Sequence, residues 1–161
     1  MDIQKMKAAE KKIWLKTEFV DIGWKRGQES PFIFTDEQRV MQVLLGIQSN
    51  AIKFTEEGGV QIKVKIIESK GHKYLEISVI DTGIGIKYED QDKLFKLFGF
   101  LQDSKELNTK GIGLGLVISD QIVTEFGGKV TFVSEPDVGS TFKFTFRLSD
   151  SEEEEESKNG K

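Results

Sequence analysis

The chain has 161 residues, a net charge of −4 and ordinary shares of hydrophobic (37%) and charged (31%) residues. This length and composition predict one soluble globular domain and are short for two. The lack of cysteine excludes disulfides and thiolate metal sites, and the single histidine, His72, gives too few groups for a multi-histidine metal centre or Ser-His-Asp catalysis. The polar start, Met1–Lys7, is unlike a signal peptide, and no apolar stretch is long enough to span a bilayer.

Three parts are expected along the chain. Residues 1–13 are rich in Lys and Glu and have few apolar anchors, so we expect a helical or linker remnant outside the main domain. Residues 14–149 form that domain. Residues 150–161 contain the run Glu152–Glu156, and like charges without an apolar face predict a disordered acidic tail. Without this tail the balance is near neutral, so no nucleic-acid binding is predicted.

Hydrophobic periodicity predicts the elements in chain order. Alternating or β-branched segments predict strands at residues 14–22, 32–34, 61–67, 74–80, 129–134 and 140–148. Helical spacing predicts one helix that Thr35 or Asp36 caps and Gly58-Gly59 follows, and two more at residues 88–98 and 114–126. Residues 99–113 show no period. The fold class is therefore α+β, a two-layer α/β sandwich with a mixed, mostly antiparallel sheet of about five strands and helices packed on one face.

Two polar residues on the first long helix are candidate ligands. The amide oxygen of Asn50 can bind a hard cation such as Mg²⁺, and Lys53 lies nearly a turn later, where it could reach a phosphate. Taken alone, the same residues are equally typical of the solvated face of an amphipathic helix.

A second cluster, Asp81-Thr82-Gly83-Ile84-Gly85-Ile86, directly follows an apolar strand. A partly buried carboxylate there needs a donor, and an adenine amine supplies one, whereas a guanine oxygen would face it acceptor to acceptor. Gly83 and Gly85 would let the backbone approach a flat ligand. Alone, the motif is also an ordinary Asp-Thr-Gly turn.

A third cluster, Lys110-Gly111-Ile112-Gly113-Leu114-Gly115-Leu116, precedes the helix at 114–126. Backbone N–H groups at a helix N-terminus bind anions, and glycines let a phosphate come close. The cluster is neither a Walker A loop nor the dinucleotide-binding fingerprint, and a lone Gly-x-Gly-x-Gly is weak evidence.

The order of these clusters resembles the ATPase domain shared by histidine kinases, type II topoisomerases, ninety-kilodalton heat-shock chaperones and mismatch-repair ATPases. Within that group the chain looks like the histidine kinases over roughly residues 30–148. The similar motifs are the N box through Asn50–Thr55, the G1 box at Asp81–Ile86, the F box at Leu94–Phe98, the G2 box at Gly111–Leu116, and Gly139-Ser140-Thr141-Phe142.

The resemblance implies a site for ATP and Mg²⁺. It assigns Asn50 to Mg²⁺, Lys53 to phosphate, Asp81 to the adenine amine, Gly85 to the ring, and Thr141 to the ring through water. Backbone N–H groups of Gly111, Gly113 and Leu114 should meet the phosphates, and residues 96–110 should form a mobile lid. The full set of expected binding residues is Asn50, Lys53, Asp81, Gly83, Gly85, Ile86, Phe98, Lys110, Gly111, Ile112, Gly113, Leu114, Gly115, Leu116 and Thr141.

The implied activity is transfer of the ATP γ-phosphate to a histidine. The acceptor would lie on a separate helical phosphoacceptor and dimerisation domain, and a response regulator receiver domain would take the phosphate next. The resemblance also implies a cytoplasmic domain without direct membrane contact, in a parent protein that could itself be membrane-anchored. His72 falls in a predicted turn, so we expect it to be inert.

The chain departs from the family pattern at Gly46, where the N box usually has a polar residue four positions before Asn50. Positions 46 and 50 share a helix face, which would put the change on the nucleotide side. This keeps open a second interpretation, a degenerate pseudokinase that binds nucleotide with weak or no turnover. A Ser/Thr-type, mitochondrial-type or anti-sigma-factor kinase, and a ligand-free α+β domain, are weaker alternatives.

Overall fold

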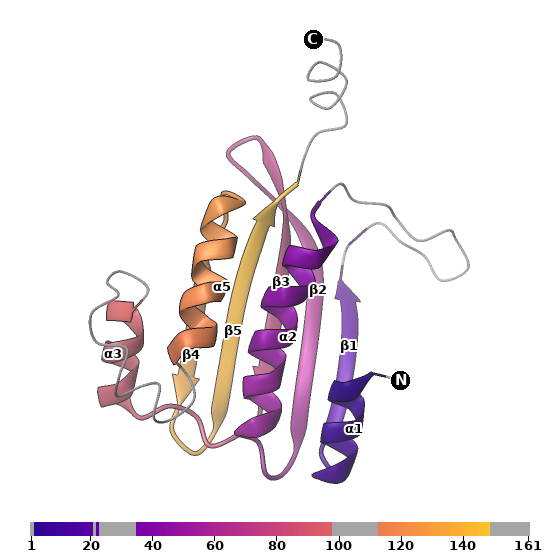
Figure 1. Ribbon diagram of the computed structural model, residues 1–161, viewed down its shortest axis with the longest axis vertical. Coiled ribbons are helices and arrows are strands. Elements are labelled where there is room, and N and C mark those ends of the chain that lie inside the picture. The colour runs from indigo at the N-terminus through magenta and orange to yellow at the C-terminus, as the bar shows by residue number, and fades with distance from the viewer. Residues whose placement is uncertain (1, 21, 23–34, 98–112, 149–161) are drawn as a thin grey trace.

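The protein is a two-layer α+β sandwich, seen in a computed structural model that describes residues 2–20, 22, 35–97 and 113–148 (Figure 1). The sheet contains β1 (Trp14–Val20), β2 (Gly59–Ser69), β3 (His72–Asp81), β4 (Val130–Glu135) and β5 (Gly139–Arg147) in the order β1-β2-β3-β5-β4. Among the strands that the structure describes, only the β1–β2 pair is parallel. The helices are α1 (Ile3–Glu10), α2 (Glu37–Lys53), α3 (Tyr88–Leu97) and α5 (Gly113–Glu125).

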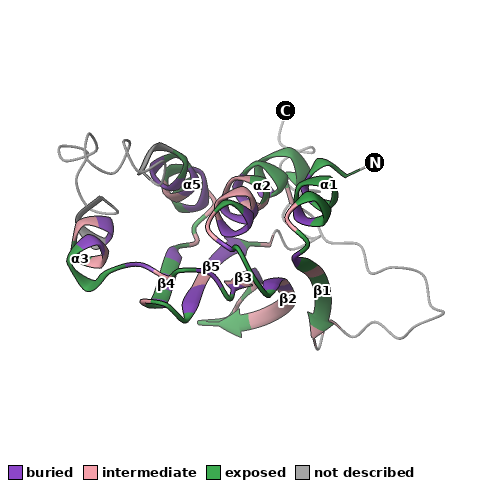
Figure 2. Cartoon of the chain, turned by 90° about the horizontal axis from the view of Figure 1, so that it is seen from below, coloured by how far each residue is buried: buried purple, intermediate pink, exposed green. Residues whose placement is uncertain are grey.

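The helices α1, α2 and α5 cover one face of the sheet, and Figure 2 shows them side by side in one layer. The opposite face carries charged and polar side chains. On it, Glu76 forms ion pairs with Lys65 and Lys143 at 3.1 and 3.7 Å. This one-sided cover explains the clean alternation along the strands.

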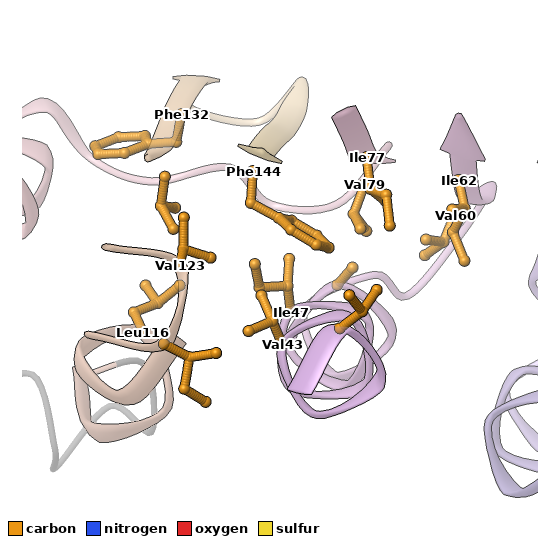
Figure 3. Close-up of a cluster of buried hydrophobic side chains, with 14 of the residues drawn as sticks. Val43, Ile47, Val60, Ile62, Ile77, Val79, Leu116, Val123, Phe132 and Phe144 are labelled. Carbon is orange, nitrogen blue, oxygen red and sulfur yellow. The ribbon is translucent and has the colours of Figure 1, made fainter. Parts of the chain in front are cut away.

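The core lies between this sheet face and helices α2 and α5 (Figure 3). Val43 and Ile47 of α2 and Leu116 and Val123 of α5 face Val79 and Phe144 of the central strands. Phe144 and Phe146 are fully buried, with ring centroids 5.8 Å apart in an edge-on arrangement. The apolar side chains at helical and strand spacing therefore meet as the sequence pattern predicts.

Local signals fix the ends of α2 and of the central hairpin. The Asp36 side chain accepts a hydrogen bond from the Arg39 N–H at 3.1 Å and caps α2. Lys70 and Gly71 join β2 to β3 in a two-residue turn with φ values of 52° and 78°, typical of a tight hairpin turn. His72 begins β3, and its Nδ1 lies 3.0 Å from Nη2 of Arg147 on β5, at the end of the sheet.

Helix α1 packs on the domain, although the sequence led us to expect residues 1–13 outside it. Ala8 and Ile13 are buried in the common core. The Lys11 ammonium donates to the carbonyls of Ile52 and Lys53 at 3.1 and 3.0 Å and pairs with Glu56 at 3.0 Å. Lys11 thus satisfies carbonyls that are left free at the C-terminal end of α2. This packing was not expected from the sequence, because α1 has few apolar residues and its contact with α2 through Lys11 is polar.

Most predicted elements are confirmed with shifts of one to two residues at their ends. The strand predicted at 14–22 ends at Val20, and the one predicted at 74–80 begins at His72 and ends at Asp81. The predicted strand at 32–34 lies outside the described residues, as does the aperiodic segment 99–113 apart from Gly113, which begins α5.

No helix among the described residues has the length and apolar character needed to cross a bilayer.

Replacing Lys11 with alanine should lower the free energy of unfolding by about 1 kcal/mol, because two carbonyls and Glu56 lose their donor. Urea unfolding at neutral pH measures this. Lys5→Ala, at an exposed position of the same helix, is the matched control and should change stability by less than about 0.5 kcal/mol. Equal losses in both variants would contradict the capping role.

Candidate functional site

A cavity of about 390 Å³ opens between α2, the turn after β3, the start of α3 and the start of α5. Its size lies within the range of small-molecule sites in proteins. The wall is mostly apolar with a few polar groups. The residues that line it are Ile47, Asn50, Ala51, Phe54, Asp81, Ile84, Gly85, Ile86, Lys87, Asp90, Leu116, Ser140 and Phe142.

Asp81 is the most constrained polar group in this wall. It ends β3, and it is 8% exposed. Its Oδ1 accepts two backbone hydrogen bonds, from Gly83 N–H at 2.9 Å and from Ser140 N–H at 3.2 Å. Among the described residues no donor reaches Oδ2, so this oxygen remains available to a ligand.

Burial raises the pKa of the Asp81 carboxyl, and the two N–H groups oppose this only in part. A carboxylate that is desolvated in this way gains from any donor that a ligand brings. The cavity therefore offers a strong hydrogen-bond acceptor surrounded by apolar side chains.

The turn after Asp81 is fastened on three sides. From α2, the carbonyl of Phe54 accepts from Ile84 N–H at 3.1 Å. From the β4–β5 turn, Asp137 N–H donates to the carbonyl of Ile84 at 2.8 Å. From α3, the Gln91 amide donates to the carbonyl of Ile86 at 2.7 Å. These bonds hold the floor of the cavity in one position.

Ser134 on β4 connects this floor to β5. Its hydroxyl accepts from Ile86 N–H at 2.8 Å, donates to the carbonyl of Gly139 at 3.1 Å, and lies 2.8 Å from the Ser140 hydroxyl. Both serines are buried, and Ser140 lines the cavity. Ser134 could not be identified from the sequence, because an isolated serine in a strand belongs to no motif.

Glycine is needed at positions 83 and 85 of this turn for a reason that differs from the one inferred from the sequence. A Cβ at Gly83 would collide with the Phe54 carbonyl oxygen, and a Cβ at Gly85 would collide with the Glu135 carbonyl oxygen. Gly85 also has a φ of 64° and lines the cavity, whereas Gly83 does not. The protein's own close backbone packing therefore requires both glycines, whether or not a ligand is bound.

Asn50 and Lys53 are placed differently. Asn50 lines the cavity, and among the described residues no hydrogen bond engages its side chain. Lys53 is exposed, lies outside the lining, and has its ammonium 5.2 Å from the centroid of the Phe54 ring. The structure thus brings Asn50, but not Lys53, into the cavity wall.

Thr141 does not line the cavity, contrary to the expectation from sequence. In the β4–β5 register it pairs with Val133, which is 77% exposed, whereas Ser140 pairs with Ser134. Because neighbouring residues in a strand point to opposite faces, Thr141 belongs to the uncovered face of the sheet. The hydroxyl at the cavity is that of Ser140, one position earlier.

Several other expected residues can be placed only in part. Ile86 and Leu116 line the cavity, and Gly115 is exposed at the start of α5. Gly113 and Leu114 form the first turn of α5, as expected for the end of the glycine cluster. The residues Phe98, Lys110, Gly111 and Ile112 lie outside the described part of the chain, as does the expected lid at 96–110 apart from its first two residues.

Lys87 and Asp90 line the cavity but were not identified from the sequence. They lie just beyond the glycine turn, where charged residues look like the ordinary start of a helix. Asp90 is buried and lies 3.7 Å from Lys93. Phe142, from the last glycine motif, packs against the core and also closes one side of the cavity, with its ring 5.4 Å from that of Phe132.

Gly46 faces α5 rather than the cavity. A Cβ at this position would have one neighbour within 4 Å, the Ser119 hydroxyl at 3.8 Å, and Gly46 is not among the lining residues. The expectation that this position lies on the nucleotide side is therefore not supported by its contacts.

The sequence of residues 35–150 matches the family described as histidine kinase-, DNA gyrase B-, and HSP90-like ATPase. A segment of 117 residues is 41% identical to the signal transduction histidine-protein kinase BarA of Escherichia coli K12, covering 72% of this chain and 13% of BarA. A segment of 134 residues is 35% identical to the adaptive-response sensory kinase SasA of Prochlorococcus marinus MIT 9313, covering 83% of this chain and 35% of SasA. The chain thus spans a minor part of these relatives.

Solved structures agree with these sequence relationships. Full-length ShkA in complex with AMPPNP superposes with a TM-score of 0.64 and 27% identity, covering 94% of this chain and 31% of ShkA. The catalytic domain of histidine kinase ThkA superposes with a TM-score of 0.60 and 25% identity, covering 89% of this chain and 83% of that domain. The five-stranded fold is therefore that of histidine kinase catalytic domains.

Asp81→Asn should make stability less sensitive to pH. Because the folded pKa of Asp81 is raised above its usual value of 3.8, its contribution to stability is fully present below pH 3.8 and is lost as the pH rises through the folded pKa. The variant should therefore become more stable relative to the wild type as the pH rises through the folded pKa of Asp81. Urea unfolding at several pH values from 3 to 8 measures the difference, with Asp92→Asn, at an exposed position on α3, as control. If the free energy of unfolding of Asp81→Asn instead fell relative to that of the wild type as the pH rises, the raised pKa of Asp81 would be contradicted.

Gly46→Ala should stabilise the protein by about 1 kcal/mol, since alanine favours the helix and the new Cβ fits beside Ser119. Gly83→Ala should instead destabilise it by about 1–3 kcal/mol because of the collision with the Phe54 carbonyl. Thermal or urea unfolding of both variants checks the contrast. Loss of stability in Gly46→Ala would mean that the space beside Ser119 is not free.

Proposed function

We propose that this chain transfers the γ-phosphoryl group of ATP to a histidine. The premise is that it belongs to the histidine kinase-, DNA gyrase B- and HSP90-like ATPase family and is an ATP-binding catalytic domain of the sensor histidine kinase type. The acceptor histidine belongs to a helical phosphoacceptor and dimerisation domain outside this chain. A response regulator receiver domain then receives the phosphoryl group.

The single observation that carries this proposal is the hydrogen bonding of Asp81. Both backbone donors bind Oδ1, and Oδ2 faces no donor among the described residues. An adenine amine supplies the missing donor, whereas a 6-oxo group would place an acceptor against the carboxylate. Ile47, Ile86 and Phe142 provide apolar surface for the flat base.

Ser140 is the second group that we assign to base recognition, in place of Thr141. Ser140 on β5 pairs directly with Asp81 on β3, and directly paired residues have their Cβ atoms about 4.5–5.5 Å apart. The amine and the adjacent ring nitrogen N1 of adenine can therefore be read by Asp81 and Ser140 together, either directly or through water.

The phosphate end of the nucleotide would lie toward Asn50 and the start of α5. The Asn50 amide oxygen would hold Mg²⁺, which neutralises phosphate charge when it is bound. The N–H groups at the start of α5 and the ammonium of Lys53 are the proposed phosphate donors. Their role is to position the γ-phosphoryl group and to stabilise its negative charge.

The reaction needs no base from this chain. The imidazole nitrogen of the acceptor histidine is already a nucleophile, so it forms the new N–P bond while the bond from the γ-phosphorus to the β–γ bridging oxygen breaks and ADP leaves. A polar residue at position 46 that activates water is therefore unnecessary for phosphotransfer. We expect slow hydrolysis of ATP beside transfer to histidine.

The departure at Gly46 left a second candidate function open, namely a nucleotide-binding module without turnover, although Gly46 lies beside Ser119 of α5 and does not line the cavity. Phosphotransfer distinguishes the two candidates, since a pseudokinase binds ATP without transferring phosphate. Neither candidate involves nucleic acid or direct contact of this domain with a membrane.

Calorimetric titration should show that the wild type binds ATP in the presence of Mg²⁺ and binds GTP at least about tenfold more weakly. When a helical phosphoacceptor domain is added with radiolabelled ATP, acid-labile label should appear on its histidine. Asn50→Ala should slow this transfer at least about tenfold, because the proposed metal ligand is lost. Thr131→Ala, at an exposed position of β4 outside the cavity lining, is a control that should leave transfer unchanged.

Binding of ATP without any transfer would support the pseudokinase instead. Absence of ATP binding at millimolar concentration would overturn both candidates.

A further inference from the structure

The cavity wall contains a second buried carboxylate, that of Asp90 in the first turn of α3. Building on the proposed ATP site, we infer that Asp90 accepts hydrogen bonds from the ribose hydroxyls of the nucleotide. The protein would then select ribonucleotides over deoxyribonucleotides, with Asp90 as the residue that determines this specificity.

The first turn of α3 is held against the floor of the cavity. The carbonyl of Lys87 accepts from the N–H groups of Asp90 and Gln91 at 2.9 and 3.0 Å. The side-chain amide of Gln91 donates to the carbonyls of Ile86 and Ser134 at 2.7 and 3.1 Å. Because the N–H of Ile86 is itself bound to the Ser134 hydroxyl, the backbone of Asp90 has a fixed position relative to the surface proposed for the base.

The burial of Asp90 is more than a helix start requires. The preceding residue, Glu89, is exposed and already places a negative charge at the N-terminal end of α3. The Asp90 side chain, in contrast, is 10% exposed, and its Oδ1 lies 3.7 Å from the ammonium of Lys93. A carboxylate has about four acceptor sites on its two oxygens, so this ion pair is compatible with further donors on the same group. Burial makes each such donor favourable.

The chemistry of MgATP limits which of its groups Asp90 can bind. Ionised phosphates are only acceptors, and their charge repels a carboxylate. The donors of the nucleotide are the adenine amine and the 2′ and 3′ hydroxyls of the ribose. Asp81 takes the amine in the proposed site, so the hydroxyls are the donors that remain for Asp90. A carboxylate suits a ribose diol because both of its oxygens accept, and acidic residues bind ribose hydroxyls in this way in dinucleotide-binding folds.

The arrangement of the helices agrees with this division of the nucleotide. The proposed phosphate groups of the site are Asn50 on α2 and the N–H groups at the start of α5. Figures 1 and 2 both place α2 and α3 on opposite sides of α5. Asp90 therefore enters the cavity wall from the side away from Asn50, where its charge opposes phosphate binding least.

Calorimetric titration of ATP and of 2′,3′-dideoxy-ATP, each with Mg²⁺, tests this inference. The wild type should bind ATP at least about tenfold more tightly, because the dideoxy analogue leaves a buried carboxylate without its donors. Asp90→Ala should reduce this preference to less than about threefold, since no acceptor remains for the hydroxyls. Asp90→Asn keeps one acceptor oxygen and should give an intermediate ratio.

Glu89→Ala is the matched control, because it removes the same charge from the same turn at an exposed position. It should leave the ratio of the two affinities as it is in the wild type. Equal losses of the ribose preference in Glu89→Ala and Asp90→Ala would contradict a direct contact between Asp90 and the sugar.

The base preference supplies an independent readout of the cavity. Asp90→Ala should still prefer ATP over GTP as the wild type does, because Asp81 is unchanged. Loss of this preference together with the ribose preference would show that the substitution reshapes the whole cavity, and it would overturn the separate role of Asp90.

Measurements on the wild type alone keep the inference testable if the Asp90 variants do not fold, which thermal unfolding would reveal. The nucleotides 2′-deoxy-ATP and 3′-deoxy-ATP each retain one hydroxyl. Each should bind more weakly than ATP and more tightly than the dideoxy analogue.

The outcomes separate the inference from the proposed function. Failure of the wild type to bind ATP would overturn both. Binding of ATP and 2′,3′-dideoxy-ATP with equal affinity by the wild type, or an unchanged ribose preference in a folded Asp90→Ala variant, would overturn the inference alone.

Discussion

The two backbone hydrogen bonds to Oδ1 of Asp81 are the constraint around which the site is organised. They join the end of β3 to the turn at Gly83 and to the start of β5 at Ser140, so one carboxylate oxygen closes the local structure while the other remains for a ligand. The same burial that makes Oδ2 a strong acceptor raises the pKa of the group and makes its charge costly in the empty protein. Stability and recognition therefore oppose each other at this residue.

The fold follows largely from periodicity. The alternation along β2, β3 and β5 and the helical spacing in α2 and α5 each predicted which side chains meet, and Figure 3 shows them meeting. Element ends were harder, because the last residues of a strand depend on its neighbours: β3 extends to Asp81 since β5 pairs with it there. The packing of α1 was missed, because a single lysine reaching two carbonyls of α2 has no counterpart in hydrophobic spacing.

Within the site, the ordered motifs indicated Asn50, Asp81, Gly85, Ile86 and Leu116, all of which line the cavity. Thr141 was named instead of Ser140 because a Gly-Ser-Thr sequence does not say which hydroxyl faces inward, and only the strand register shows that Ser140 does. Lys87 and Asp90 were missed because charged residues at the start of a helix are common, and Ser134 was missed because its partners Ile86 and Ser140 come from other elements. Gly83 and Gly85 were expected to let a ligand approach the backbone. The structure shows that a Cβ at these positions would collide with the carbonyl of Phe54 or of Glu135.

The Lys70-Gly71 turn has a consequence for engineering the molecule. It joins β2 to the first residue of β3, while Asp81 is the last residue of that strand, so about ten residues at roughly 3.3 Å each separate the turn from the cavity. A Cβ at Gly71 would have nothing within 4 Å. A small domain inserted at this tip would therefore project into open space some 30 Å from Asp81, giving a handle for attachment or optical detection at the far end of the sheet.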